Sequence, residues 1–283
     1  MSKICFLILA HKNQNQLMRL INHLKKDFDV YVHIDKNSNI DISSFDNVRI
    51  YKKIRVCYAE ITQIISTLLL LKEAVKNNYD RYCFISGQDI PLKNNEYIND
   101  FFDRNFDKEY ISYSQVNSLE DNKVFNIELY DRILYYNFEG FSRKLLHSSI
   151  RNFVSDLKIM NKHIQYNIYY GSSWWNLTNL AIKYILDYLN ENKHFIKQFK
   201  NVWGSDEFFF QSILLNSKLK NNCINDNLRY LYWAYEKSSS PKTFTIDDYN
   251  NIKGYMGECI FSRKFDETID NDIIDKLYKD LEN

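Results

Sequence analysis

The start of the chain holds two apolar runs that end in polar residues, with a helical pattern between them. Ile4–Ala10 is apolar throughout and is followed by His11. The mostly apolar run 30–34 is followed by Asp35. Runs of this kind are typical of strands that are buried on both faces of a parallel sheet. Apolar residues recur at helical spacing within 14–26, so this region predicts a strand, a helix and a second strand.

The same alternation continues to about residue 115. We expect a short strand at 48–51, a helix within 58–77 and a buried strand at 82–85 that ends shortly before Asp89. Strands that alternate with helices predict an α/β fold, with a mostly parallel central sheet flanked by helices. Ligands of such sheets bind beyond the carboxyl ends of the strands. These ends are expected at His11, Asp35 and Asp89.

The pattern is weaker after residue 115. Helices are predicted at 177–191 and from about 206 to 215, whereas 116–146 is rich in aromatic and charged residues without a clear period. We find no internal repeat, linker or change of composition. Residues 1–283 are therefore expected to form a single domain.

The composition excludes some classes of partner and site. The chain has 37 Lys and Arg against 36 Asp and Glu residues, and a net charge of +1 provides no basic field for nucleic acid. The five cysteines are scattered without a C-x-x-C pair, so neither a disulfide framework nor a zinc site is expected. No apolar run is long enough to span a bilayer. We expect a cytoplasmic protein, and leave open a peripheral contact with the inner face of the membrane.

The usual phosphate-binding motifs are missing. Neither G-x-G-x-x-G nor G-x-x-x-x-G-K-[ST] occurs. The D-x-D at 27–29 precedes its strand and that at 270–272 opens a terminal helix, so neither is placed to supply hard oxygen ligands to a nucleotide-bound metal. We therefore expect no metal and no other cofactor. Cations would then have to balance a leaving diphosphate, and the candidates are Lys242, Arg263 and Lys264; exposed surface cations are the plain alternative.

The stretch WGSDEFFFQ at 203–211 places Asp206 and Glu207 directly before three phenylalanines. The two acids either cap a buried helix or place a carboxylate for chemistry at the end of the core. An acid in the first turn of a helix interacts favourably with the helix dipole, which would keep Glu207 ionised. The two roles are compatible, because an ionised carboxylate is ready to accept a proton.

Six stretches in order along the chain resemble one family. They are FLILAHKN with VYVHIDKNS, then YDRYCFISGQDIPLK, GSSWWNLT, SDEFFFQSIL, YWAYEKSSSPKTF and IFSRKFD, and they extend from about residue 3 to residue 266. Together they are similar to the core-2/I-branching β-1,6-N-acetylglucosaminyltransferases, a family that includes peptide O-xylosyltransferases. The resemblance implies a GT-A type fold, an inverting mechanism and independence from metal, in a bacterial member.

Matching positions imply roles for several residues. Glu207 matches the catalytic base of the family, and Ser205 replaces a proline two residues before it, where serine is a good N-cap. Asp35 matches an aspartate that contacts the nucleoside. Lys264 matches a lysine that holds the diphosphate, and Lys242 lies near a second diphosphate cation, across an alignment gap. Trp233 and Tyr235 resemble aromatic residues of the acceptor pocket.

The remaining candidates rest on position. His11, Asp89 and Arg263 are assigned to the nucleotide sugar, since they follow predicted strands or adjoin Lys264. The alternative for Asp89 is that it shapes the loop and does not touch the ligand. Asp206 either positions the loop or contacts the acceptor. Either Trp174 or Trp175 is expected to stack on a sugar and the other to be core, because adjacent side chains of a strand point opposite ways. Two further acceptor contacts are expected at Glu128 and Arg132.

These observations predict an inverting, metal-independent transfer of a sugar from a UDP-sugar to a hydroxyl of a glycan or glycolipid acceptor. Residues 1–115 would form the nucleotide-sugar-binding half and 116–283 the acceptor and catalytic half. N-acetylglucosamine is the favoured sugar, and xylose is the alternative within the family. The sequence also leaves open a non-catalytic nucleotide-sugar- or glycan-binding protein and a metal-dependent GT-A enzyme. The acceptor, the linkage and the oligomeric state are not predicted.

Overall fold

The computed structural model describes residues 2–116, 129, 131–133, 166–234, 240–255, 257 and 259–282. The helices are α1 (Gln14–Leu24), α2 (Ile61–Ala74), α3 (Asn95–Arg104), α7 (Asn179–Glu191), α8 (Phe209–Leu215), α9 (Tyr249–Tyr255) and α10 (Asp272–Leu281). The strands are β1 (Ile4–Ala10), β2 (Asp29–Ile34), β3 (Arg49–Tyr51), β4 (Arg81–Ser86), β5 (Asp89–Pro91), β6 (Glu109–Ile111), β7 (Ser114–Gln115), β8 (Tyr169–Tyr170), β9 (Trp175–Thr178), β10 (Cys223–Ile224), β11 (Arg229–Leu231) and β12 (Phe261–Arg263).

Seven of the described strands form the central sheet, in the order β10-β6-β9-β4-β1-β2-β3. β1 lies in the middle and is parallel to β2 and β4, and β2 is parallel to β3. β9 is antiparallel to both of its neighbours, β4 and β6. The apolar runs of β1 and β4 are buried almost throughout, which is why they read as continuous apolar segments in the sequence. The predicted α/β class with a mostly parallel central sheet is confirmed.

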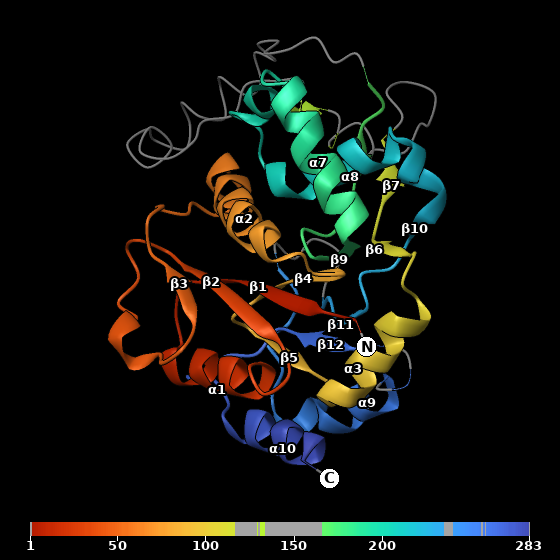
Figure 1. Ribbon diagram of the computed structural model, residues 1–283. Helices are drawn as coiled ribbons and strands as arrows, with labels where there is room; N and C mark the ends of the chain where they lie inside the picture. The colour runs from red at the N-terminus through yellow and green to blue at the C-terminus, as the bar shows by residue number, and fades with distance from the viewer. Residues whose placement is uncertain are drawn as a thin grey trace.

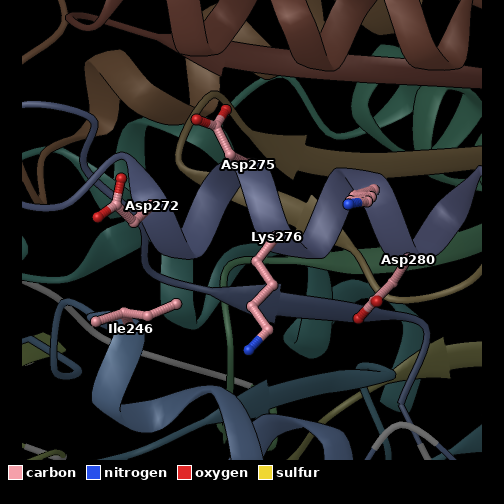
Figure 2. Close-up of a pocket in the computed structure, with 6 residues that line it drawn as sticks. Ile246, Asp272, Asp275, Lys276 and Asp280 are labelled. Carbon is pink, nitrogen blue, oxygen red and sulfur yellow. The ribbon is translucent and has the colours of Figure 1, made fainter.

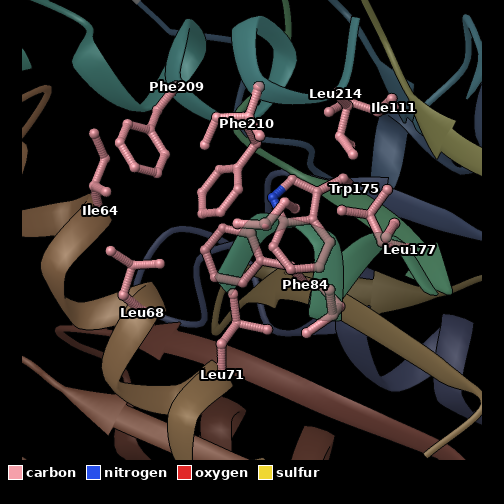
Figure 3. Packing of buried hydrophobic residues seen from close by; sticks show 14 of the residues in the cluster. Ile64, Leu68, Leu71, Phe84, Ile111, Trp175, Leu177, Phe209, Phe210 and Leu214 are labelled. Carbon is pink, nitrogen blue, oxygen red and sulfur yellow. The ribbon is translucent and has the colours of Figure 1, made fainter. Parts of the chain in front are cut away.

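Helices cover both faces of this sheet (Figure 1). α2, α7 and α8 pack on one face, where Ile64 and Leu68 of α2 meet Phe84 of β4 and Phe210 of α8 in a single core cluster (Figure 3). α1 and α3 pack on the other face, against the opposite side chains of the same strands. This division follows from the strand, whose successive side chains point to opposite faces.

A second sheet has the order β11-β12-β5, and its strand β12 ends at Arg263, the first residue of the basic pair Arg263–Lys264. β12 is parallel to β11 and antiparallel to β5, and in the latter pairing Arg263 lies opposite Asp89. A third core cluster, which includes residues of α9 and α10, packs beside this sheet. The second sheet therefore brings residues near the end of the chain to the turn that follows β4.

Between Val116 and Tyr166 the structure describes only residues 129 and 131–133. The two ends lie together, because the amide of Val116 donates to the carbonyl of Ile168 at 2.9 Å and β7 pairs with β8 beside them. Within the described residues no helix is both long enough and apolar enough to cross a membrane. The division into halves at residue 115 stays a prediction, as does the single domain.

Candidate functional site

The residues that follow β1, β2 and β4 meet at one edge of the central sheet, which we call the carboxyl edge. His11 follows β1, and the amide of Asp35 after β2 donates to the carbonyl of Ala10 at 2.8 Å. The amide of Gly87 after β4 donates to the carbonyl of Leu9 at 2.9 Å. The structure thus brings together the strand ends that the sequence predicted, at the usual ligand position of an α/β sheet.

His11 and Asp35 offer complementary polar groups at this edge. The pKa of His11 is lowered, first by burial of its ring and then by the cations Lys12 and Arg263, although much of the residue still reaches solvent. Its imidazole is therefore neutral at neutral pH, with one donor and one acceptor nitrogen. The carboxylate of Asp35 accepts from the amides of Asn37 at 2.6 Å and Val56 at 3.1 Å. These bonds fix its orientation and leave it acceptor capacity for a ligand.

The basic pair lies beside His11. The pKa of Lys264 is lowered by burial and by the charges of Arg263 and Lys12, so several cations share this part of the edge. The ammonium of Lys264 donates to the Ser240 hydroxyl at 3.3 Å, which leaves its charge without a carboxylate among the bonds of the described residues. Lys12 forms an ion pair with Asp266. Arg263 forms an ion pair with Asp89, so among the bonds of the described residues Lys264 is the member of this group whose charge is left for a polyanion.

Lys242 differs from Lys264. Its ammonium forms an ion pair with Asp248 at 2.6 Å, so its charge is already balanced. Its carbonyl accepts from the amide of Lys264 at 3.4 Å, so the backbones of the two lysines lie side by side. The predicted contact with a diphosphate stays a prediction, and it would require the pair with Asp248 to loosen.

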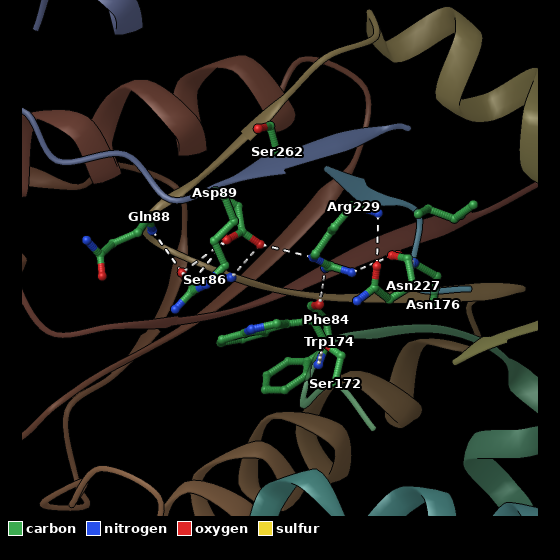
Figure 4. Close-up of polar contacts among 12 residues, drawn as sticks. Phe84, Ser86, Gln88, Asp89, Ser172, Trp174, Asn176, Asn227, Arg229 and Ser262 are labelled. Atoms are coloured by element: carbon green, nitrogen blue, oxygen red, sulfur yellow. Dashed lines mark hydrogen bonds and ion pairs between the residues drawn. The ribbon is translucent and has the colours of Figure 1, made fainter. Parts of the chain in front are cut away.

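The prediction that Asp89 contacts the nucleotide sugar directly is wrong. Its side chain is fully buried, and its carboxylate meets Arg263 at 3.0 Å and Arg229 at 3.3 Å (Figure 4). It also accepts from the amide and the hydroxyl of Ser86. A carboxylate that is enclosed by two guanidinium groups has no surface left for a ligand.

The two tryptophans that follow Ser173 also need correction. Trp175 is fully buried between Phe84 and Phe210, at ring distances of 5.1 and 5.2 Å, so it cannot stack on a sugar. Trp174 is 9% exposed, and the guanidinium of Arg263 lies over its ring at 4.8 Å. The expectation that one of the pair is core holds for Trp175. Trp174 supports a cation instead of offering an open sugar platform.

The acid pair lies in a 3₁₀ turn and not in the first turn of an α-helix. The turn spans Ser205–Glu207 and begins after Gly204, which has a left-handed backbone with φ of 76°, and α8 starts only at Phe209. The expected capping by Ser205 is wrong, because its hydroxyl is buried without a partner among the described residues. The three phenylalanines are buried and root this turn in the core, as the sequence suggested.

Asp206 ties the turn to two other elements. Its Oδ2 accepts from the side-chain amide Nε2 of Gln63 on α2 at 2.8 Å and from the hydroxyl of Ser173. Burial raises the pKa of Asp206, and Oδ1 is buried without a partner among the described residues. The positioning role is supported by these bonds. A contact with the acceptor stays a prediction.

Glu207 is not held ionised by its position. Burial raises its pKa to about 8, with a further contribution from the charge of Asp206, whereas Arg132 and a hydrogen bond from Tyr170 oppose the rise. The dipole argument fails because the turn is a short 3₁₀ segment and the carboxylate is largely desolvated. A carboxylate with a pKa near the working pH is well matched to accept a proton.

Glycine is required at two positions around Glu207. A Cβ on Gly204 would lie 2.9 Å from Oε2 of Glu207, and a Cβ on Gly171 would lie 1.9 Å from the carbonyl oxygen of Ser112. The amide of Gly171 donates to the carbonyl of Glu207 at 2.8 Å. The loop at 171–175, which we call the GSSWW loop, thus packs its backbone directly against the turn that carries Glu207.

This loop also joins the acid to the cations. Ser173 donates to Asp206, and the next residue, Trp174, lies under Arg263. Arg263 is close enough to lower the pKa of Asp206. These contacts connect the turn that carries Glu207 with the basic pair.

Two aromatic residues of this site were missed by the sequence reasoning. The rings of Tyr58 and Trp203 pack edge to face at 5.8 Å, and Tyr58 is 68% exposed. Burial raises the pKa of Tyr58, the charge of Glu207 raises it further and that of Arg263 lowers it, so the ring lies near both the acid and the cation. Trp203 lies three residues before Asp206 and was a visible candidate, whereas Tyr58 lies at the start of the range predicted as a helix, and α2 begins only at Ile61.

The other predicted acceptor residues are only partly described. Trp233 is 50% exposed and follows β11, next to Tyr232, whose carbonyl accepts from the amide of Lys242 at 2.8 Å. Arg132 lies close to Glu207, since its Nη1 would be 3.9 Å from a Cβ on Gly204. Glu128 and Tyr235 lie outside the described residues.

No three His, Cys, Asp or Glu side chains of the described ranges gather into a set that could hold a metal ion. Asp29 begins β2, at the opposite end from Asp35, and bonds to Arg49 and Tyr79, as expected for a D-x-D on the wrong side of the sheet. The requirement for a metal is therefore left to experiment.

A surface hollow of about 490 Å³ lies elsewhere, along α10 (Figure 2). It is lined by Ile246, Asp272, Asp275, Lys276, Lys279 and Asp280. Its acids and lysines all lie on α10, and it contains none of the residues around Glu207. We therefore place the functional site at the carboxyl edge and not in this hollow.

Comparison with known proteins identifies the family. The family model described as Core-2/I-Branching enzyme matches residues 4–253. The chain belongs to this family. Membership of the Core-2/I-branching enzymes agrees with the α/β sheet and its polar carboxyl edge.

Several relatives of this Core-2/I-branching chain carry the name xylosyltransferase. It is 22% identical over 304 residues to Xylosyltransferase 1 of Homo sapiens and 20% identical over 304 residues to Xylosyltransferase 2 of Rattus norvegicus. Both matches cover 97% of this chain, but only 30% and 33% of the relatives. The chain thus spans about a third of the length of these relatives.

A solved structure described as a putative glucose-1-phosphate thymidylyltransferase from Bacillus anthracis in complex with a sucrose is also similar. Its TM-score is 0.33 at 14% identity, over 65% of this chain and 75% of that one.

Proposed function

We propose that this chain transfers a sugar from a UDP-sugar to a hydroxyl of a glycan or glycolipid acceptor, with inversion and without a metal. The observation that carries the proposal is the placement of Glu207 and the Arg263–Lys264 pair in one site, joined by Ser173 and Trp174. A base and a cation group on the two sides of a reacting carbon are the parts that in-line displacement needs.

In this mechanism the acceptor oxygen attacks the anomeric carbon as the bond from that carbon to the diphosphate oxygen breaks. The proton of the attacking hydroxyl passes to Glu207, and the electron pair of the broken bond leaves with UDP. Lys264 and Arg263 stabilise the charge that develops on the diphosphate. Asp35 and His11 would bond to the nucleoside, since both present polar atoms at the carboxyl edge.

The donor sugar has two candidates. N-acetylglucosamine follows from the resemblance of the whole chain to the core-2/I-branching enzymes. Xylose is the second candidate because the relatives named above are called xylosyltransferases. Trp233, Arg132, Glu128 and Tyr235 are the proposed acceptor contacts. We further propose a cytoplasmic site of action, with peripheral contact at the inner face of the membrane.

The test is release of UDP from a panel of UDP-sugars and glycan acceptors, with and without EDTA. We expect turnover that survives EDTA, and a fall on the order of 100-fold or more in Glu207→Gln with UDP binding retained. Glu96→Gln on the exposed face of α3 is the matched control and should act as the wild type does. Turnover that is lost in EDTA would contradict the metal-free mechanism, and near-normal rates in Glu207→Gln would remove the base. UDP binding without turnover on any donor would favour a non-catalytic binding protein.

A further inference from the structure

Arg263 is held from three sides. Its Nη1 donates to Oδ1 of Asp89 at 3.0 Å and to the hydroxyl of Ser86, and its guanidinium lies 4.8 Å over the ring of Trp174. The register of β5 and β12 sets this arrangement, because it pairs Arg263 directly with Asp89. A slip of one residue would turn the side chain to the other face of the sheet.

Asp89 is shared between two arginines that differ in exposure. Its Oδ2 meets Nε of Arg229 at 3.3 Å, while Arg229 also donates to the carbonyls of Phe84 at 2.6 Å and Asn227 at 2.7 Å (Figure 4). The side chains of Asp89 and Arg229 are 0% exposed, and that of Arg263 is 18% exposed. One carboxylate cannot neutralise two guanidinium groups. The surplus positive charge therefore emerges at Arg263.

The described bonds of Arg263 use Nη1 alone. Its Nε and Nη2 have no partner among the described residues, although a guanidinium carries five donors in a rigid plane. Because the planar guanidinium of Arg263 is bonded through Nη1 and packed on the ring of Trp174, its remaining N–H donors keep a fixed direction. Such a group loses little freedom when it binds an anion, and it matches phosphate geometry with two parallel bonds.

We propose that Asp89, Ser86 and Trp174 are positioning residues, which hold the free edge of the Arg263 guanidinium ready for the diphosphate of the donor. The inference rests on the proposed function only for the identity of this anion. It assigns to the SGQD turn after β4 and to Trp174 a role that acts through Arg263. The two tasks of the GSSWW loop are then distinct, since Ser173 holds the acid turn and Trp174 holds the cation.

The test compares ligands with and without phosphates. Ser86→Ala removes one acceptor of Arg263 and keeps the pair between Asp89 and Arg229, so it should fold. Ser262→Ala is the matched control, because Ser262 is a buried serine of β12 whose hydroxyl bonds to the carbonyl of Tyr230 and not to Arg263. Trp174→Leu removes the ring face. Asp89→Asn is the strongest variant but leaves Arg229 buried without a full counter-charge, so its fold must be checked by circular dichroism.

Affinities for UDP, uridine and pyrophosphate are measured by calorimetry. We expect Ser86→Ala and Trp174→Leu to weaken the binding of UDP and of pyrophosphate by about tenfold, which is the size of one bond to a charged group. The affinity for uridine should stay within about twofold of the wild-type value. An equal loss for UDP and uridine would show a merely structural role and overturn the inference. So would unchanged affinity for UDP and pyrophosphate in both variants.

The pyrophosphate measurements separate this inference from the proposed function. If the wild type binds pyrophosphate but not UDP, the proposed function is contradicted. In that case a loss of affinity for pyrophosphate in Ser86→Ala would still support the positioning of Arg263. A wild type that binds neither ligand would overturn both. A loss in Ser262→Ala equal to that in Ser86→Ala would also overturn the inference, because the effect would not depend on contact with Arg263.

Discussion

Oε2 of Glu207 lies 2.9 Å from the point where a Cβ on Gly204 would stand. No real Cβ approaches an oxygen so closely, and the backbone of Gly204 is left-handed, with φ of 76°. Gly204 also donates its amide to the carbonyl of Ala59 at 2.8 Å, so the residue cannot easily move. The position of the acid therefore depends on the absence of a side chain three residues earlier.

Gly204→Ala should displace the carboxylate and strain the turn. We expect kcat to fall by about tenfold or more, since a shift of about 1 Å at a reacting group is costly, and the free energy of unfolding to fall by about 1 kcal/mol or more. Rates of UDP release and urea unfolding measure the two effects. Gly254→Ala is the control, because no atom lies within 4 Å of its Cβ position and alanine favours a helix such as α9. Equal effects of the two substitutions would contradict the steric argument.

The rate should rise with pH across the pKa of Glu207. Only the ionised carboxylate accepts a proton, so kcat/KM is expected to increase through about pH 8 and then level. The pH profile of kcat/KM on the free enzyme measures this pKa. A profile that is already flat above pH 6 would show that Glu207 is ionised in the empty site.

The free energy of unfolding should fall with pH over the range in which the rate rises. The pKa of Glu207 is raised from an unfolded value of about 4.3 to about 8 in the folded state. The folded protein therefore binds more protons between these values, and the stability present below about pH 4.3 is lost as pH rises through the folded pKa. Glu207→Gln should be more stable than the wild type at pH 9 and similar at pH 4, as measured by urea unfolding. A constant difference across this range would exclude the linkage.

Arg132 should set the pKa of Glu207. Its charge lowers this pKa, so Arg132→Gln is expected to move the rising limb of the pH profile to higher pH, whereas Arg132→Lys keeps a charge and should move it less. The measured quantity is the midpoint of the limb and not the rate at a single pH. If Arg132 acts only on the acceptor, KM for the acceptor will rise and the midpoint will stay.

Lys264 and Lys242 should differ in their effect on UDP. Lys264 meets only the Ser240 hydroxyl among the described side chains, whereas Lys242 is paired with Asp248. We expect Lys264→Ala to weaken the binding of UDP by about tenfold or more and Lys242→Ala to weaken it much less. A cation that is already paired with a carboxylate contributes little to the binding of an anion. Titration calorimetry at two salt concentrations measures both. The reverse order would show that Lys242 leaves Asp248 when UDP binds.

The sequence was informative where local pattern decides structure. β1, β2, β4, α1 and α2 lie close to the predicted ranges, because long apolar runs and helical stripes are strong local signals. β5, β10, β11 and β12 were not predicted. They are two or three residues long, and distant partners hold them, so no local period marks them.

The candidate site was likewise predictable only where a local pattern marks its residues. His11 and Asp35 could be placed because a parallel sheet gathers the ends of its strands at one edge. Asp89 and Trp174 were given the wrong contacts, because their partner Arg263 is about 90 to 175 residues away in the chain and reaches them only through the register of β5 and β12. The raised pKa of Glu207 was also hidden, since it depends on how many atoms surround the carboxylate and not on the letters beside it.

The hydrogen bond between Val116 and Ile168 has a practical consequence. Two anchor points that touch in the folded protein can be bridged by inserts of different length without a change in the span, and loop-closure entropy grows only slowly with length. The length of chain between these two residues can therefore change at little entropic cost, provided that Leu129 and Ile133, which are buried in the core, and Arg132, which lowers the pKa of Glu207, are kept.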